Sequence, residues 1–128
     1  MKLLDSTFLI DLSKGNKDVL PIIQSKEYLF TAQICMFELI RGMFYRHLPS
    51  EKILEMMGLF EDIRVLPLDD AAVVKSAQIS AELLQRGMPI PDNDCLIAGI
   101  ALSKNISTIV TRNVKDFQRI KELNVESY

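Results

Sequence analysis

Cysteine and histidine are scarce in this chain, whose 128 residues include two Cys, one His and no Trp. Cys35 and Cys95 lie far apart within apolar stretches, where we expect them to be buried small hydrophobic residues. Neither a disulfide framework nor a close-spaced Cys/His metal motif is therefore expected, and a reducing cytoplasm is the expected compartment. His47 has no partners for a nucleophilic site, so we expect it on the surface or in a loop.

Targeting signals and long apolar runs are also missing. Asp5 and Asp11 interrupt the first apolar residues, which argues against a signal peptide. No apolar stretch approaches the roughly 18–20 residues that a membrane helix needs. The chain also contains no Gly-rich phosphate loop, internal repeat or flexible linker. We expect a single domain over residues 1–128 with no membrane association.

An excess of positive charge is absent as well. Lys and Arg total 15 against 17 Asp and Glu, which gives a formal net charge of −2. This balance excludes a strongly basic domain that binds nucleic acid through its overall charge. Hydrophobic residues at 48% and charged residues at 25% are typical of a globular protein.

Short apolar segments alternate with segments of helical periodicity. Runs of Leu, Ile and Val predict buried strands at 2–4, 63–66 and 107–110, with weaker candidates at 28–30 and 125–127. Buried strands interleaved with amphipathic helices are typical of a parallel sheet covered on both faces. The sequence therefore predicts an α/β fold of three layers, α/β/α, around a four- or five-stranded mainly parallel sheet.

The predicted helices have recognisable starts and buried faces. Ser50 is the expected N-cap of one helix, and Asp69 or Asp70 the expected N-cap of another that ends at Gly87. A third helix opens at residues 91–92 and a short fourth follows residues 111–113. The expected buried face of the second helix has apolar residues spaced 3, 4 and 3 apart: Val74, Ala77, Ala81 and Leu84.

Two acidic residues follow predicted strands directly. Asp5 comes after the first strand and Asp116 shortly after the strand at 107–110. Ligands of open parallel sheets bind beyond the carboxyl ends of the strands, so both positions suit a functional group. The alternatives are that Asp5 only caps the helix that starts near Thr7, and that Asp116 is a solvated loop residue.

Two further acids lie in predicted helices. Glu38 is surrounded by apolar neighbours and must face solvent, a cation or a partner, because an unpaired buried carboxylate is costly. Its alternative role is a surface ion pair with Arg41. In the helix that begins near residue 91, we interpret Asp92 as the N-cap and Asp94 as the functional candidate.

Clustered carboxylates repel one another by several kcal/mol per pair at about 4–6 Å, so such a cluster needs protons or divalent cations. Oxygen ligands without His or Cys favour Mg²⁺ or Mn²⁺. The matching chemistry is metal-assisted hydrolysis of a phosphodiester. If two divalent ions neutralise the four acids, the rest of the chain carries about +2, since −2 minus −4 is +2.

Four segments together resemble VapC-type toxins of the PIN-domain ribonuclease family. They are residues 4–11 (LDSTFLID), 37–42 (FELIRG), 86–98 (RGMPIPDNDCLIA) and 110–117 (VTRNVKDF). The resemblance implies a PIN-like fold and an endoribonuclease that acts as the toxin of a toxin–antitoxin pair. It also implies a VapB-type antitoxin, homodimerisation and an acidic quartet that binds Mg²⁺ or Mn²⁺: Asp5, Glu38, Asp94 and Asp116.

Other polar residues of these segments are assigned supporting roles. Asn113, Ser6, Thr7 and Asp92 are the expected auxiliary polar groups, and Arg41 and Arg112 are candidate contacts to RNA. Four methionines lie with aromatic residues on two successive predicted helices, where they form either a partner surface or a buried helical hairpin: Met36, Met43, Met56 and Met57.

Two other functions remain open from the sequence. A phospho-acceptor receiver domain is also α/β with an Asp at a strand end, but it needs an acidic pair where Asp5 stands alone. A catalytically silent PIN-fold binding module would keep the fold and its antitoxin contacts without cleaving RNA.

Overall fold

The computed structural model describes residues 1–128 and contains a five-stranded sheet in which every neighbouring pair of strands is parallel. The strand order is β3-β2-β1-β4-β5. The strands are β1 (Lys2–Leu4), β2 (Leu29–Ala32), β3 (Arg64–Leu66), β4 (Thr108–Val110) and β5 (Asn124–Glu126). The predicted parallel sheet is confirmed, and both weaker strand candidates overlap real strands.

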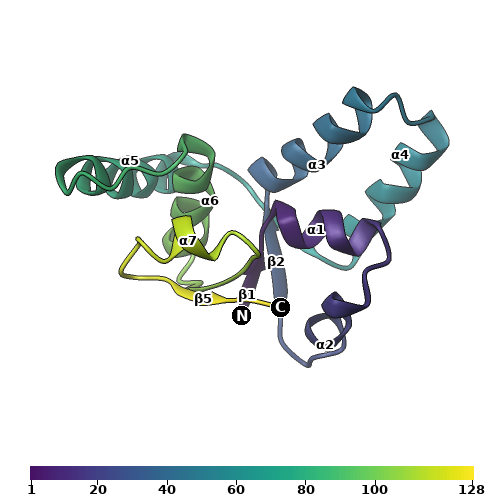
Figure 1. Ribbon diagram of the computed structural model, residues 1–128, viewed down its shortest axis with the longest axis horizontal. Helices are drawn as coiled ribbons and strands as arrows, with labels where there is room; N and C mark the ends of the chain where they lie inside the picture. Colours follow the sequence, from purple (N-terminus) through teal and green to yellow (C-terminus); the bar gives the residue numbers. More distant parts are fainter.

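Helices cover both faces of this sheet, so the predicted three-layer α/β/α fold is confirmed. Seen along the sheet, α5, α6 and α7 lie on one side of the strands and α1 to α4 on the other (Figure 1). Their bounds are α1 (Ser6–Ser13), α2 (Leu20–Ile23), α3 (Gln33–Tyr45), α4 (Ser50–Met57), α5 (Asp70–Gln85), α6 (Asp92–Ser103) and α7 (Val114–Phe117), with 3-10 turns η1 (Lys17–Val19) and η2 (Gly58–Glu61). None of them combines the length and apolarity needed to span a membrane.

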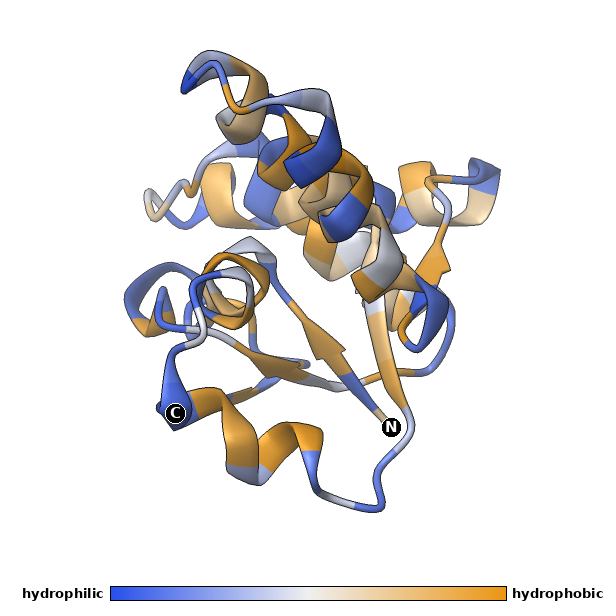
Figure 2. Ribbon diagram, turned by 90° about the vertical axis from the view of Figure 1, so that its right-hand side faces the viewer, coloured by the Kyte–Doolittle hydropathy of each residue, from blue (hydrophilic) through white to orange (hydrophobic).

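The central strands form the core because their side chains are apolar on both faces of the sheet. Leu3 and Leu4 of β1 are fully buried, as are Ile109 and Val110 of the neighbouring β4. Leu3 is in register with Ile109 and Leu4 with Val110, so both strands end at the same edge. Figure 2 shows the strands as largely hydrophobic, with hydrophilic segments concentrated in loops and helices. This shared edge positions the residues that follow each strand.

The strand order excludes the receiver-domain hypothesis. Receiver domains of the flavodoxin-like class have the order 2-1-3-4-5, with the third strand beside the first. In this chain β3 lies at the sheet edge beside β2, and β1 is flanked by β2 and β4. The connectivity therefore differs from that of a receiver, in addition to the missing acidic pair.

The predicted buried face of α5 is wrong. Val74 and Leu84 are 59% and 63% exposed, and Ala77 and Ala81 between them are also exposed. The buried face lies on the opposite side of the helix and consists of Ala72, Ser76, Ile79 and Leu83. Two residues of this face, Ala72 and Ser76, are small, which allows α5 and α6 to approach each other closely where Ser76 lies against Gly99.

Two predicted N-caps are displaced by one residue. Pro49 and Pro91 occupy the cap positions of α4 and α6, without a side-chain cap hydrogen bond, and Ser50 and Asp92 are the first helical residues. The reason is local: a proline ahead of each helix has the extended backbone that a cap requires, and the next residue already takes part in the first turn. Asp69, in contrast, caps α5 as predicted, accepting from the Ala72 amide at 2.9 Å.

The predicted surroundings of the cysteines and of the histidine are confirmed. Cys35 and Cys95 are buried and form no disulfide. His47 is exposed in the turn between α3 and α4, where its φ of 55° is in the left-handed region.

Candidate functional site

Asp5 lies at the carboxyl end of β1 and is only 2% exposed. Its Oδ1 accepts from the Thr7 hydroxyl at 2.6 Å and from the amides of Thr7 and Phe8, so Asp5 caps α1. Its Oδ2 accepts from the Thr111 hydroxyl at 2.6 Å. The capping role considered from the sequence is thus real, but it uses one oxygen and leaves the other facing β4. Burial raises the pKa of Asp5 despite these hydrogen bonds.

Glu38 projects from α3 toward the same region and is half-buried. Its Oε1 is buried without a hydrogen-bond partner. Burial raises the pKa of Glu38, and the nearby charge of Asp5 adds to the rise, while the Ser6 hydroxyl and the Arg41 charge oppose it. Arg41 forms no ion pair with Glu38 within 4 Å; its guanidinium lies 5.0 Å from the Phe37 ring centre instead. The surface-pair interpretation of Glu38 is therefore wrong.

Asp94 and Asp116 are connected through one amide group. The side-chain nitrogen of Asn113 donates to Asp94 Oδ2 at 3.0 Å and to Asp116 Oδ2 at 3.2 Å. Burial raises the pKa of Asp94 to about 6, and repulsion from Asp116, Glu38 and Asp5 contributes to that rise. The other three acids predicted for the site thus lie close enough to Asp94 for their charges to act on it.

The side chains of this site are of the types that bind a divalent cation, although they do not converge on one point in the present arrangement. All the donors are oxygens, and the orphaned Oε1 of Glu38 lacks the partner that a buried carboxylate requires. No three Asp, Glu, His or Cys side chains are arranged around one common point as they stand. The Asn113 amide donates to Oδ2 of Asp94 and Oδ2 of Asp116, so the Oδ1 of each carboxylate stays available to an ion.

The predicted auxiliary residues divide into two groups. Thr7, Ser6 and Asn113 contact or influence the carboxylates, whereas Asp92 is exposed at the start of α6 and forms no hydrogen bond or ion pair with the site. Sequence reasoning missed Thr111, which hydrogen-bonds to Asp5. The sequence feature that could have identified Thr111 is its position, because it directly follows β4 at the same sheet edge as Asp5.

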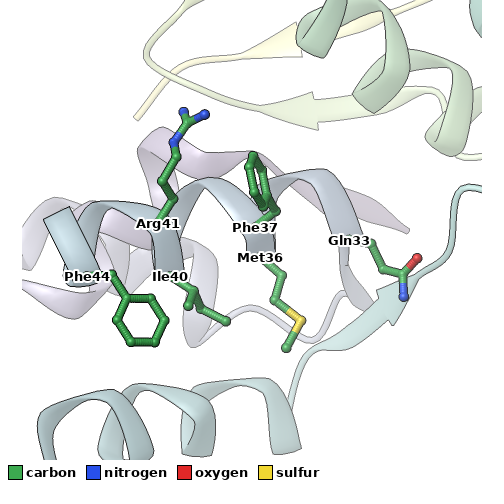
Figure 3. Close-up of a pocket in the computed structure, with 6 residues that line it drawn as sticks. All are labelled: Gln33, Met36, Phe37, Ile40, Arg41 and Phe44. Carbon is green, nitrogen blue, oxygen red and sulfur yellow. The ribbon is translucent and has the colours of Figure 1, made fainter. Parts of the chain in front are cut away.

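A largely apolar groove of about 490 Å³ runs along α3 beside Glu38. Phe37 and Arg41 project from one side of α3 and Met36, Ile40 and Phe44 from the other (Figure 3). Phe37 and Phe44 are 55% and 62% exposed. The groove is lined by Gln33, Met36, Phe37, Ile40, Arg41 and Phe44.

The four methionines of α3 and α4 do not share one environment. Met43 is 1% exposed and belongs to the core, while Met56 is partly buried against it. Met36 lines the α3 groove, and Met57 is half-buried. Met43 and Met56 therefore belong to a buried helical hairpin, whereas Met36 lies on a surface that a partner could cover.

Residues 2–123 match the sequence profile of the PIN domain. The chain belongs to the PIN domain family. This PIN domain is 31% identical over 111 residues to the tRNA(fMet)-specific endonuclease VapC of Salmonella typhimurium, and the match covers 83% of each chain. It is 30% identical over 130 residues to ribonuclease VapC1 of Haemophilus influenzae strain R2866, which covers 98% of this chain and 96% of the relative.

Solved VapBC structures share the fold of this PIN domain. A chain in the crystal structure of DNA-bound VapBC from Salmonella typhimurium superposes with a TM-score of 0.88 at 27% identity, covering 98% of this chain and 96% of that chain. A chain of VapBC-1 from nontypeable Haemophilus influenzae gives a TM-score of 0.84 at 29% identity, with the same coverage. The resemblance to VapC-type PIN proteins seen in the sequence is confirmed.

The raised pKa of Asp94 predicts a specific pH dependence for the metal-free PIN domain. Asp94 ionises near 3.8 in an ordinary environment and at about 6 in the folded protein. Between these values the folded state binds more protons, so its free energy of unfolding falls as the pH rises from about 4 to about 6. Since Asp94 is partly exposed, we expect a loss of only about 1 kcal/mol.

Thermal melts in chelator across this range measure the effect, with Asp94→Asn as the reference. The stability difference between the variant and the wild type should grow in favour of the variant up to about pH 6 and then stay constant. A difference that does not change with pH would contradict the raised pKa.

Proposed function

We propose that this PIN domain is a divalent-metal-dependent endoribonuclease and the toxin of a toxin–antitoxin pair, with residues 1–128 as one domain acting in the cytoplasm. The observation that carries the proposal is the gathering of Asp5, Glu38, Asp94 and Asp116 at the carboxyl edge of a parallel sheet. The names of its VapC relatives support RNA as the substrate.

The chain's own residues have distinct parts in the proposed reaction. Asp5 and Asp94 would hold Mg²⁺ or Mn²⁺, with Asp116 completing the ligand set. When bound, such an ion supplies Lewis-acid stabilisation of the scissile phosphate and lowers the pKa of a coordinated water. Glu38 Oε1 is buried without a hydrogen-bond partner, and in the proposed reaction it would bind a cation or accept a proton from the attacking water.

RNA would approach a site that is surrounded by few free positive charges. Arg41 is exposed on α3 next to Glu38, and we propose it as a contact to the RNA backbone. Arg112 is already paired with Asp11 at 2.6 Å and Asp18 at 3.2 Å, so it has less capacity for a phosphate. Affinity for RNA should therefore depend strongly on the bound metal and only modestly on monovalent salt.

A VapB-type antitoxin and a second copy of the chain are the proposed protein partners. The solved VapBC structures support the antitoxin. Apolar side chains are exposed on several helices, and a partner would cover them: Val74 and Leu84 on α5, Phe44 on α3 and Leu54 on α4. We propose that these surfaces serve the antitoxin and the homodimer.

The test is cleavage of purified transfer RNA and ribosomal RNA fragments with Mg²⁺ or Mn²⁺, or with excess chelator. We expect discrete fragments in millimolar metal, no cleavage in chelator and recovery when Mn²⁺ is added back. Addition of a VapB-type antitoxin encoded beside this chain should block cleavage. Cleavage that persists in chelator would refute the metal dependence. A protein that neither cleaves RNA nor gains thermal stability with metal would instead be the silent binding module.

A further inference from the structure

The turn that follows β4 connects three carboxylates of the proposed site. Thr111 donates to Asp5, and the Arg112 backbone amide donates to the Thr7 hydroxyl at 3.0 Å, which itself donates to Asp5. Asn113 completes the turn by donating to Asp94 and Asp116. The position of residues 111–113 therefore sets how Asp5 lies relative to the other two carboxylates.

The Arg112 side chain leaves the site and attaches this turn to α1. Its Nε donates to Asp11 Oδ2 at 2.6 Å, and its Nη2 lies 3.2 Å from Asp18 Oδ2. Its guanidinium carbon stands 4.7 Å from the centre of the Tyr128 ring, a cation–π arrangement. Arg112 is thus held by two carboxylates and one aromatic ring outside the catalytic edge.

Tyr128 contacts both Asp11 and Arg112 and so links the two residues. Its hydroxyl donates to Asp11 Oδ2 at 2.6 Å, and its ring packs edge-to-face on the fully buried Phe8 ring at 5.0 Å. The hydrogen bond from Tyr128 lowers the pKa of Asp11, and burial raises the pKa of Tyr128 to about 12. At neutral pH the carboxylate is therefore charged and the phenol protonated, as this geometry requires.

We call the cluster formed by Asp11, Arg112 and Tyr128 the Arg112 clamp. We propose that this clamp positions the metal-binding carboxylates by fixing residues 111–113 against α1. The clamp side chains form no hydrogen bond or ion pair with the four carboxylates; they act through Thr7, Thr111 and Asn113. This inference rests on the proposed function, because it assigns a role toward the metal of that site. Residues that orient metal ligands from outside commonly affect metal affinity by about 10–100-fold.

Arg112→Gln separates positioning from simple electrostatics. Removing a positive charge beside an acidic site should tighten Mn²⁺ binding if Arg112 acts only through its charge. If the clamp positions the carboxylates, the same substitution weakens Mn²⁺ binding by at least about tenfold. The two explanations predict opposite signs.

Tyr128→Phe is the second variant, because it keeps the ring on Phe8 and Arg112 and removes only the hydroxyl. Loss of one hydrogen bond worth about 0.5–1.5 kcal/mol corresponds to roughly 2–10-fold weaker Mn²⁺ binding. The matched control is Lys75→Gln, which removes a positive charge from the Lys75–Glu122 ion pair of 2.8 Å on α5. The control should bind Mn²⁺ within about twofold of the wild type.

The measurement is the Mn²⁺ affinity of the purified full chain without RNA, read from the free-Mn²⁺ electron paramagnetic resonance signal, together with metal-free thermal melts. Weaker binding by both clamp variants, with an unchanged control, supports positioning. Unchanged or tighter Mn²⁺ binding by a folded Arg112→Gln variant overturns the positioning role. Loss of Mn²⁺ binding by Asp94→Asn in the same assay shows that the metal site itself is then still present. If Arg112→Gln does not fold, unchanged binding by Tyr128→Phe overturns it. Absence of Mn²⁺ binding in the wild type overturns the proposed metal site itself.

Discussion

Replacing Asp94 with asparagine is expected to reduce RNA cleavage by at least about 100-fold while the protein stays folded. The substitution removes a charged oxygen from the proposed metal site but keeps a side-chain acceptor of the same shape for the Asn113 amide. Since the charge of Asp94 is opposed by burial and by three other carboxylates, its removal should also stabilise the metal-free protein. We expect a gain of about 1 kcal/mol and a melting temperature about 4 °C higher.

Loss of activity combined with a gain in stability is the signature of a functional residue, because a damaged fold lowers both. The matched control is Asp92→Asn, which changes the same residue type two positions earlier in the first turn of α6. Asp92 is exposed and lies outside the site, so cleavage should stay within about threefold of the wild type. Cleavage by Asp94→Asn at wild-type rate, in a sample free of contaminating nuclease, would refute the role of Asp94.

Replacing Gly99 with alanine is expected to destabilise the protein by about 3 kcal/mol. A Cβ at this position of α6 would lie 1.9 Å from Ser76 Oγ and 2.7 Å and 2.8 Å from the backbone nitrogen and Cα of Ser76. Two of these three atoms are backbone, so α5 and α6 must separate to make room. Urea denaturation of the metal-free protein measures the change in the free energy of unfolding.

Two further variants show whether the cause is the helix crossing. Gly42→Ala on α3 meets nothing within 4 Å, so it should be neutral or stabilising by up to about 1 kcal/mol. Adding Ser76→Ala to Gly99→Ala removes the hydroxyl contact but not the backbone contacts, so most of the destabilisation should remain. Full rescue by Ser76→Ala would show that the hydroxyl alone limits the approach of the helices.

Two of the four acidic residues could be located from the sequence because each follows a strand whose end is recognisable. Asp5 directly follows an apolar strand, and Asp116 lies shortly after another, so a parallel sheet brings both to one edge. Glu38 could be singled out because a carboxylate among apolar residues needs a partner. The gathering of these residues follows from strand direction and order rather than from any one motif.

The buried face of α5 could not be predicted from hydrophobic periodicity. Two stripes on this helix have helical spacing, and the more hydrophobic one, with Val74 and Leu84, is exposed. The buried stripe includes Ala72 and Ser76, whose small size permits contact with Gly99. Close packing selects for shape, which a hydrophobicity pattern does not contain.

The Arg112 clamp was also beyond reach of the sequence. Its two hydrogen bonds to Asp11 come from Arg112 and Tyr128, which lie 101 and 117 positions further along the chain. The sequence alone predicts Arg112 as a candidate RNA contact, because it lies in a site motif. Only the fold shows that its side chain turns toward Asp11, whereas its backbone amide faces Thr7.

Anomalous diffraction from crystals of the metal-free chain soaked in millimolar Mn²⁺ tests most directly whether the four carboxylates form one metal site. We expect an anomalous peak at the carboxyl edge of β1 and β4, within about 2.5 Å of oxygens of Asp5 and Asp94. We expect no such peak in crystals of Asp94→Asn. A wild-type map without a peak among Asp5, Glu38, Asp94 and Asp116, from crystals in which this edge is open to solvent, would contradict the proposed metal centre.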